Sequence, residues 1–262
     1  MKIGIRNGSL GTDCLNAIRM GAQLGFDGVE LDIGADYTGN PIWHDEGRRQ
    51  LREAAADTGC EISSLCLGVL WQVSPASDKP EVREEALKII TASAAFATEL
   101  GAKWILLPIT PGEDGANADQ APQRWIEIVA QAAPVAEDLG VVYCLENVGR
   151  GCGKSADDLQ TLLSGLDSPA VGVYYDVGNA VAFGHSPVGE IKQLAEALEI
   201  VHIKDREADY LGEGVVPIPD CLKALQDIGY DDWLVLETPP TEDPVEAGSR
   251  NLEYLRGLLA TI

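Results

Sequence analysis

The sequence has 262 residues, of which 45% are hydrophobic, and 42 acidic against 19 basic residues give a net charge of −23 at pH 7. This charge repels phosphate polymers and anionic membranes, which argues against nucleic acid and membranes as partners. The six cysteines form no CxxC pair, no apolar run approaches membrane-spanning length, and the N-terminus is typical of a strand rather than a signal peptide. These features predict a cytoplasmic protein with reduced thiols.

Eight strand-like segments alternate with eight helix-like segments along the chain. The predicted strands are Lys2–Arg6, Gly28–Asp32, Glu61–Leu67, Trp104–Pro108, Val141–Glu146, Val171–Asp176, Ile200–Lys204 and Trp233–Glu237. The predicted helices are Asp13–Leu24, Gly47–Thr58, Pro80–Leu100, Pro122–Leu139, Ala156–Leu163, Pro187–Leu198, Ile218–Ile228 and Pro244–Leu259. Thr12 and Ser155 are the expected N-caps of the first and fifth helices.

Glycines mark the ends of five predicted helices, at the position where a left-handed residue commonly ends a helix. They are Gly25, Gly59, Gly101, Gly140 and Gly229. Strict alternation of strands and helices indicates a parallel sheet, and eight units indicate that the sheet closes. The sequence therefore predicts an α/β fold in which residues 1–262 form a single-domain (β/α)8 TIM barrel.

Metal-ligand side chains end four consecutive predicted strands, the fifth to the eighth. They are Glu146, Asp176, His202 and Glu237. Active sites in this fold lie at the carboxyl ends of the strands, where consecutive strands are neighbours, so we expect the four groups to converge. Three carboxylates and one imidazole suit a single divalent cation, with Mn²⁺ preferred and Mg²⁺, Co²⁺ or Zn²⁺ as alternatives. The competing interpretation is that these side chains only pair with Lys or Arg.

The motifs around these four side chains resemble the xylose-isomerase-like TIM barrels, a superfamily of sugar isomerases, ketose 3-epimerases, hydroxypyruvate isomerases and endonuclease IV. The matching segments are Leu145-Glu146-Asn147, Asp176-Val177-Gly178-Asn179, Val201-His202-Ile203-Lys204-Asp205 and Leu236-Glu237-Thr238. The resemblance implies that Glu146 and Glu237 are catalytic: both bind the metal, and they remove and return a proton on opposite faces of the substrate. Asp176 and His202 would then only hold the ion.

Five further residues near the strand ends are predicted to bind the substrate: Arg6, Glu30, Asn179, Lys204 and Arg206. The basic groups could contact a carboxylate, a phosphate or a hydroxyl. For Lys204 and Arg206, an ion pair with Asp205 or Glu207 is the alternative. The loop Gly149–Ser155 lacks the first glycine of a phosphate loop, since position 148 is Val148, but it offers Arg150 and Lys154 beside the fifth strand.

Departures from the resembled enzymes narrow the function. Ketose 3-epimerases carry a histidine, a glutamate and an arginine where this chain has Asn179, Cys152 and Ala208, which argues against a free-ketose 3-epimerase of that kind. Endonuclease IV needs several additional histidines for three zinc ions, and this chain has only three histidines. Of the two remaining, His44 could overhang the site, whereas His185 is interpreted as a loop or capping residue.

The predicted function is a divalent-metal-dependent isomerase or epimerase of a sugar or sugar phosphate, which moves a proton next to a carbonyl through an enediolate. The partner is a small polar, sugar-like substrate, and a homo-oligomer is possible. Two alternatives remain. One is a dehydratase acting on a keto-inositol with the same metal and acid–base pair, and the other is a non-catalytic barrel that binds a sugar or a metal.

Overall fold

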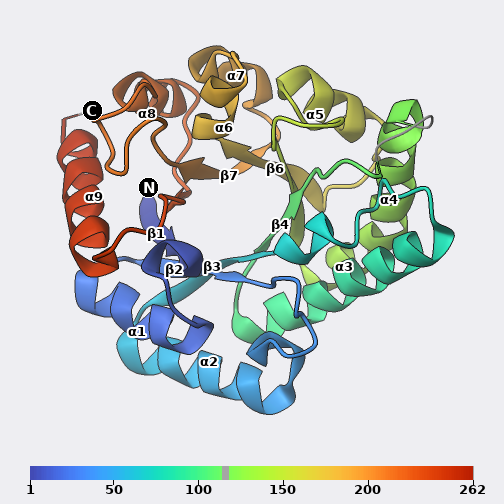
Figure 1. Ribbon diagram of the computed structural model, residues 1–262, viewed down its shortest axis with the longest axis horizontal. Helices are drawn as coiled ribbons and strands as arrows, with labels where there is room; N and C mark the ends of the chain where they lie inside the picture. The colour runs from blue at the N-terminus through green and yellow to red at the C-terminus, as the bar shows by residue number, and fades with distance from the viewer. Residues whose placement is uncertain (114–117, 262) are drawn as a thin grey trace.

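The computed structural model describes residues 1–113 and 118–261, and its eight parallel strands close into a barrel in the order β1 to β8. The strands are β1 Lys2–Arg6, β2 Gly28–Asp32, β3 Glu61–Cys66, β4 Trp104–Pro108, β5 Val142–Glu146, β6 Val171–Asp176, β7 Leu198–Ile203 and β8 Trp233–Leu236. Figure 1 shows them at the centre of a ring of helices. The predicted (β/α)8 TIM barrel is confirmed.

Each strand is followed by at least one helix. The α-helices are α1 Cys14–Leu24, α2 Asp45–Thr58, α3 Pro80–Leu100, α4 Ala121–Leu139, α5 Ala156–Ser164, α6 Val177–Ala182, α7 Pro187–Leu194, α8 Ile218–Asp227 and α9 Pro244–Leu259. Short 3-10 helices lie in the loops: η1 Asn7–Leu10, η2 Pro41–Trp43, η3 Gly68–Trp71 and η4 Ala118–Gln120. The five glycines that were expected to end helices in a left-handed conformation all have positive φ, between 70° and 92°.

Several local predictions were wrong. The predicted helix Pro187–Leu198 ends at Leu194, and β7 begins at Leu198 instead of Ile200. The N-cap of α1 is Asp13 instead of Thr12, because the Asp13 carboxylate accepts a hydrogen bond from the backbone N–H of Asn16 at 2.9 Å. Helix α6 was not predicted; it begins immediately after β6, with the Asp176 side chain as its N-cap. Ser155 is confirmed as the N-cap of α5, where it accepts a hydrogen bond from the backbone N–H of Asp158.

The core is divided by the barrel wall. A large cluster of buried apolar side chains packs the helices onto the outside of the strands. A smaller cluster from β3 to β8 forms a second group: Cys66, Trp104, Leu106, Val142, Cys144, Tyr174, Ile200, Trp233 and Val235. Its members follow the two-residue alternation of strand side chains, which identifies them as the filling of the barrel interior.

The structure also shows the state of the cysteines and the character of the helices. All six cysteines are free thiols, and five of them are buried. Among the helices of the described residues, none combines the length and the apolar character needed to cross a membrane.

Candidate metal and active site

The four predicted metal ligands form one layer of side chains above the apolar filling of the barrel. Each of them lies two residues after an interior residue of its own strand, so the pleat directs it inward. The interior residues that precede them are Cys144, Tyr174, Ile200 and Val235. The strand alternation that fills the barrel with apolar groups therefore also brings these ligands together at its carboxyl end.

The ligand atoms of Glu146, Asp176, His202 and Glu237 all lie within 4.8 Å of one another. His202 Nδ1 is 3.4 Å from Glu146 Oε1, 3.9 Å from Asp176 Oδ2 and 3.5 Å from Glu237 Oε2. Atoms bound to one divalent ion at about 2.0 to 2.2 Å lie up to about 4.4 Å apart, so the cluster is close to the size that an ion requires. The structure thus brings the predicted ligands to one point.

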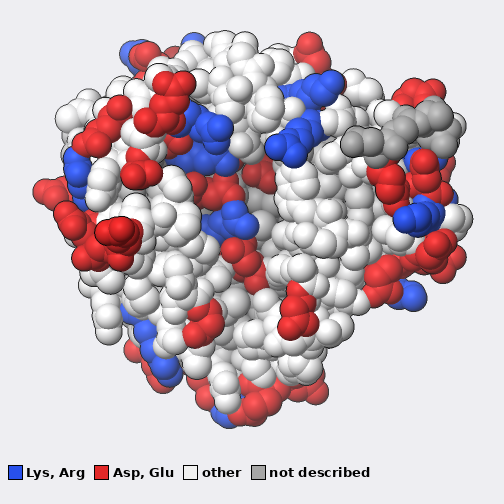
Figure 2. Space-filling view, viewed as in Figure 1, with Lys and Arg blue, Asp and Glu red and all other residues white. Residues whose placement is uncertain are grey.

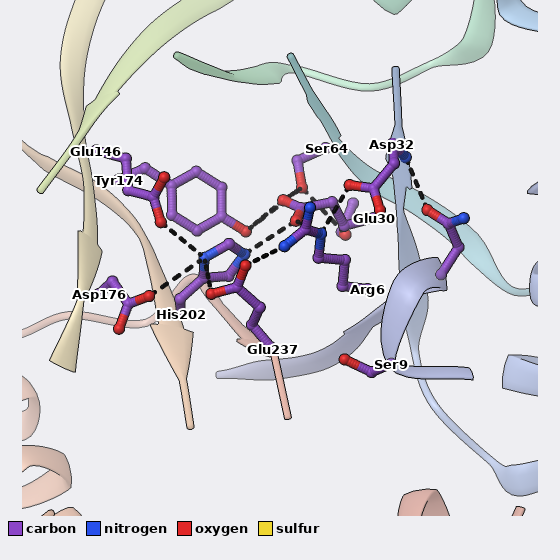
Figure 3. A network of polar contacts seen from close by, with 12 residues as sticks. Arg6, Ser9, Glu30, Asp32, Ser64, Glu146, Tyr174, Asp176, His202 and Glu237 are labelled. Atoms are coloured by element: carbon purple, nitrogen blue, oxygen red, sulfur yellow. Dashed lines mark hydrogen bonds and ion pairs between the residues drawn. The ribbon is translucent and has the colours of Figure 1, made fainter. Parts of the chain in front are cut away.

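Glu30 lies behind this cluster and orients its histidine. Its Oε1 is 2.9 Å from His202 Nε2, and its Oε2 accepts hydrogen bonds from Ser64 Oγ at 2.7 Å and Tyr174 Oη at 2.8 Å. Nε2 is bonded to Glu30, so the other ring nitrogen, Nδ1, faces the carboxylates, as Figure 3 shows. We call Glu30 and the four ligands the floor of the site.

Two buried atoms of the floor make no hydrogen bond of acceptable geometry among the described residues: His202 Nδ1 and Asp176 Oδ2. Both side chains are fully buried. Asp176 Oδ2 is paired with the Lys204 ammonium at 2.6 Å, whereas His202 Nδ1 has no hydrogen-bond partner in the described part of the chain, which is rare for a buried polar atom. The donor set of three carboxylates and one imidazole nitrogen fits the divalent cation that the sequence predicts.

The ends of β5 and β6 are tied together by Asn147, the residue after Glu146. Its side chain accepts from the backbone N–H of Asp176 at 2.7 Å and donates to the Asp176 carbonyl at 2.9 Å. Asp176 Oδ1 in turn accepts the backbone N–H of Asn179 at 2.8 Å, as the cap of α6. These bonds leave Oδ2 as the oxygen of Asp176 that faces the floor.

Lys204 and Arg6 surround Glu237 from two sides. Lys204 Nζ lies 2.6 Å from both Glu237 Oε2 and Asp176 Oδ2. It can reach them because Gly178 has no side chain; a Cβ there would lie 2.4 Å from Lys204 Cγ. Arg6 donates from Nη1 to Glu237 Oε1 and from Nε to Asp32 Oδ1, the latter at 2.7 Å.

Glu146 and Glu237 have contrasting charge environments. Burial raises the pKa of the Glu146 carboxyl to about 7. Burial alone would also raise the pKa of Glu237, but the positive charges of His202, Lys204 and Arg6 hold it well below its usual range. Burial likewise raises the pKa of Asp176, against the opposing charge of Lys204. The ligand carboxylates therefore differ in their readiness to hold a proton.

Two cavities open above the floor, and Figure 2 shows this face hollowed near its centre, with acidic and basic side chains in the hollow. The first, of about 700 Å³, lies between the loops after β1, β7 and β8. The second, of about 320 Å³, is lined by Glu146 and Asn179 among others and is here called the catalytic cavity. Both are lined by Arg6, Lys204, Arg206 and Glu237.

Four of the five predicted substrate-binding residues line these cavities; Glu30 does not. Glu30 is fully buried beneath His202, so its position offers a contact with the histidine instead of the substrate. Strand β2 continues for two residues past Glu30 to Asp32, and Asp32 is the acidic residue of β2 that lines a cavity. His44, which the sequence suggested could overhang the site, lines neither cavity, and His185 Nδ1 lies 3.7 Å from Glu190 Oε1.

The alternative interpretation of Arg206, an ion pair with Asp205, is wrong. The buried Asp205 carboxylate accepts backbone N–H groups of the following loop instead, from Arg206, Gly212, Gly214 and Val216 at 2.8 to 3.1 Å. Asp205 therefore shapes the loop after β7 and leaves the Arg206 guanidinium at the cavities. Nothing in the sequence pattern distinguishes this loop-organising role from an ion pair.

A parallel eight-stranded barrel with a cation-sized cluster of carboxylate and imidazole groups at its carboxyl end defines a class of enzyme-like TIM barrels. The family model of the xylose isomerase-like TIM barrel matches residues 18–257. The chain belongs to this family.

Known relatives of the chain include sugar epimerases. L-ribulose-5-phosphate 3-epimerase UlaE of Salmonella typhi is 24% identical over 257 residues, covering 94% of this chain and 90% of that protein. A structure of L-ribulose 3-epimerase superposes with a TM-score of 0.86 at 19% identity, covering 99% and 95% of the two chains. The IOLI protein, crystallised with a zinc atom, gives a TM-score of 0.85 at 17% identity, covering 100% and 99%. These relatives support an enzyme of the isomerase and epimerase class.

Proposed function

We propose that this protein is a divalent-metal-dependent isomerase or epimerase that moves a proton next to the carbonyl of a sugar or sugar phosphate. The observation that carries the proposal is the position of the two glutamates. Glu146 and Glu237 come from β5 and the end of β8, both line the catalytic cavity, and both reach His202 Nδ1 to within 3.5 Å. Binding alone does not require two carboxylates open to the ligand, whereas a proton removed on one face and returned on the other does.

The four predicted ligands divide into two pairs with different roles in this proposal. Glu146 and Glu237 remove and return the proton through an enediolate, while Asp176 and His202 hold the ion. A bound divalent ion supplies Lewis-acid stabilisation of the negative charge that develops on the substrate. Mn²⁺ matches the mixed carboxylate and imidazole set best, and Mg²⁺, Co²⁺ and Zn²⁺ are alternatives.

The substrate contacts proposed for this reaction are the polar side chains of the cavity wall: Arg6, Asn179, Lys204 and Arg206. Lys204 and Arg6 already bond Glu237, so they would hold this base in place as well as meet a hydroxyl or a carbonyl oxygen. The named relatives act on a phosphorylated and a free ribulose, and the two share a reaction at carbon 3. This shared reaction supports the type of chemistry, while the sugar remains open.

Solvent exchange tests the proposal. The chelator-treated protein is reloaded with Mn²⁺ and incubated in D₂O with ketoses, ketose phosphates and a keto-inositol, and the products are followed by proton NMR. The expected result is deuterium on the carbon next to the carbonyl, dependent on Mn²⁺. Loss of water from a keto-inositol, without such exchange into a recovered sugar, would indicate the dehydratase instead. Binding with neither reaction would indicate a non-catalytic barrel.

A further inference from the structure

Trp71 and Phe183 are the exposed aromatic side chains of the described residues, with 46% and 45% of their surface accessible, and both line the catalytic cavity. Trp71 ends η3 in the loop after β3, and Phe183 follows α6 in the loop after β6. The other aromatic residues of the described chain are buried or partly buried. Large apolar side chains left open at the mouth of a polar cavity indicate a surface that a ligand covers.

Arg150, in the loop after β5, lines the same cavity as these two side chains. Its guanidinium carbon lies 6.0 Å from the centroid of the Trp71 ring, at the limit of a cation–π contact. Within residues 1–113 and 118–261 it pairs with no carboxylate, although the chain has 42 acidic residues. Its donors therefore remain free for a ligand. We call Trp71, Arg150 and Phe183 the rim.

The position of Phe183 is restricted by Gly149, in the loop after β5. Gly149 has a φ of +73°, and a Cβ at this residue would lie 1.8 Å from two carbons of the Phe183 ring. The ring thus packs directly against the backbone of Gly149, which restricts its movement although almost half of its surface is open. A side chain held in this way loses little conformational entropy when a ligand covers it.

The space beyond the rim is large enough for more than one ring. Sites for small ligands measure about 300 to 1,000 Å³, so the catalytic cavity, at about 320 Å³, suits one small sugar. A further cavity of about 580 Å³ adjoins it, and the two share Trp71 and Arg150 in their linings. Two of the three rim residues, Trp71 and Arg150, therefore lie between the catalytic cavity and this second cavity.

We propose that the rim binds a second sugar ring, so that the substrate is a keto sugar with a glycosidically linked ring. This inference rests on the proposed function and adds a substrate class to it. A pyranose ring presents an apolar C–H face, which matches the two aromatic rings, and hydroxyls at its edge, which match the donors of Arg150. A phosphate ester presents no apolar face to pack on aromatic rings, and a free monosaccharide would leave the rim uncovered.

The experiment compares substrates that differ only in the group beyond the ketose. The probes are maltulose and isomaltulose, in which fructose carries a glucose ring, against fructose and fructose 6-phosphate, all with the Mn²⁺-loaded protein in D₂O. The expected result is a kcat/KM of exchange about tenfold higher for at least one disaccharide than for fructose, the ratio that about 1.4 kcal/mol of contact energy gives. A preference for fructose or for the phosphate ester would overturn the proposal.

Variants connect the preference with the rim. Trp71→Ala and Phe183→Ala should each reduce the ratio of disaccharide to fructose kcat/KM, and Trp71→Phe should retain much of it. Leu139→Ala, at an exposed apolar residue that ends α4, serves as the matched control and should leave the ratio unchanged. An unchanged ratio in both alanine variants at the rim would refute the second-ring subsite.

Calorimetric titration separates a failure of this inference from a failure of the proposed function. If no probe exchanges deuterium, the proposed reaction fails with these sugars, and the same four compounds are titrated into the Mn²⁺-loaded protein. Disaccharide binding that exceeds fructose binding and is lost in Trp71→Ala supports the subsite. Absence of disaccharide binding, or binding that Trp71→Ala does not change, overturns it.

Discussion

At the floor of the barrel mouth nearly every charged or polar atom faces another one within hydrogen-bond or ion-pair distance, and the side chains are buried, except that Glu237 is partly buried. At the rim, a few residues beyond the strand ends, the aromatic side chains are almost half exposed and Arg150 has no carboxylate partner in the described part of the chain. We propose that a cation completes the floor and that a ligand covers the rim.

The difference follows from the elements that carry each region. The floor residues lie on or directly after strands whose register is fixed by the barrel, so their positions are determined by the fold. The rim residues lie in loops after β3, β5 and β6, and loops tolerate changes that strands do not. In our proposal, the floor carries the chemistry of this protein and the rim selects the compound on which it acts.

The largest effect is expected from the two glutamates of the floor. Glu146→Gln and Glu237→Gln keep the size of the side chain and an oxygen ligand but remove the proton acceptor. General acid–base catalysis contributes about 10²- to 10⁴-fold, so exchange by each Mn²⁺-loaded variant should fall by that factor. The exposed Glu253→Gln on α9 is the control. Near-normal exchange in both floor variants would show that another group acts as the base.

Removal of the cation should destabilise the floor and hence the fold. If the native state holds the ion and the unfolded chain does not, Mn²⁺ at a hundred times its dissociation constant should add about 2.7 kcal/mol to the free energy of unfolding. Thermal unfolding with chelator and with Mn²⁺ measures the difference. A melting temperature that is the same in both conditions would mean that no cation site forms.

A variant of Glu30 tests whether this buried carboxylate supports metal binding through His202. Glu30→Gln should weaken Mn²⁺ binding by about 10- to 100-fold, because the charge that orients and polarises the His202 ring is lost. Glu190→Gln is a matched control, since Glu190 is also a buried glutamate that accepts a tyrosine hydroxyl, from Tyr175. If Glu30 instead bound the substrate directly, the variant would raise KM and leave Mn²⁺ affinity unchanged.

The smallest effect is expected for the rim in the absence of a sugar. Trp71→Ala should change the free energy of unfolding by no more than about 0.5 kcal/mol, the usual range for exposed positions, and should not alter Mn²⁺ affinity. Chemical denaturation and metal titration measure the two quantities. A large loss of stability would mean that Trp71 belongs to the packed structure and not to a ligand surface.

The sequence predicts the floor well because the direction of a strand side chain follows a simple two-residue alternation. Glu146, Asp176, His202 and Glu237 were placed at the ends of neighbouring strands, and alternation alone then directs them inward. Glu30 and Asp32 both lie on the inward face of β2, and Glu30 lies one inward position below the mouth, so that Asp32 is the residue that lines a cavity. The register between β2 and β3 shifts at Val29 and Glu30, a feature with no sequence signal.

The rim and the loop after β7 could not be predicted, because both depend on contacts between distant segments. Phe183 follows α6, a six-residue helix without a clear apolar period. Its packing against Gly149 joins loops that follow two different strands. In the same way, Asp205 next to Arg206 suggests an ion pair in sequence, and only the folded loop presents four backbone N–H groups to its carboxylate.

The most direct test of the floor is an equilibrium titration of the chelator-treated protein with Mn²⁺, carried out on the wild type and on Asp176→Asn. Asp176 is suited to this test because its Oδ2 faces the other ligands and because the proposed reaction gives it no role as an acid or a base. We predict one ion per wild-type chain and a clearly weaker binding in the variant. Equal Mn²⁺ binding by the two proteins, or none by either, would contradict the metal site.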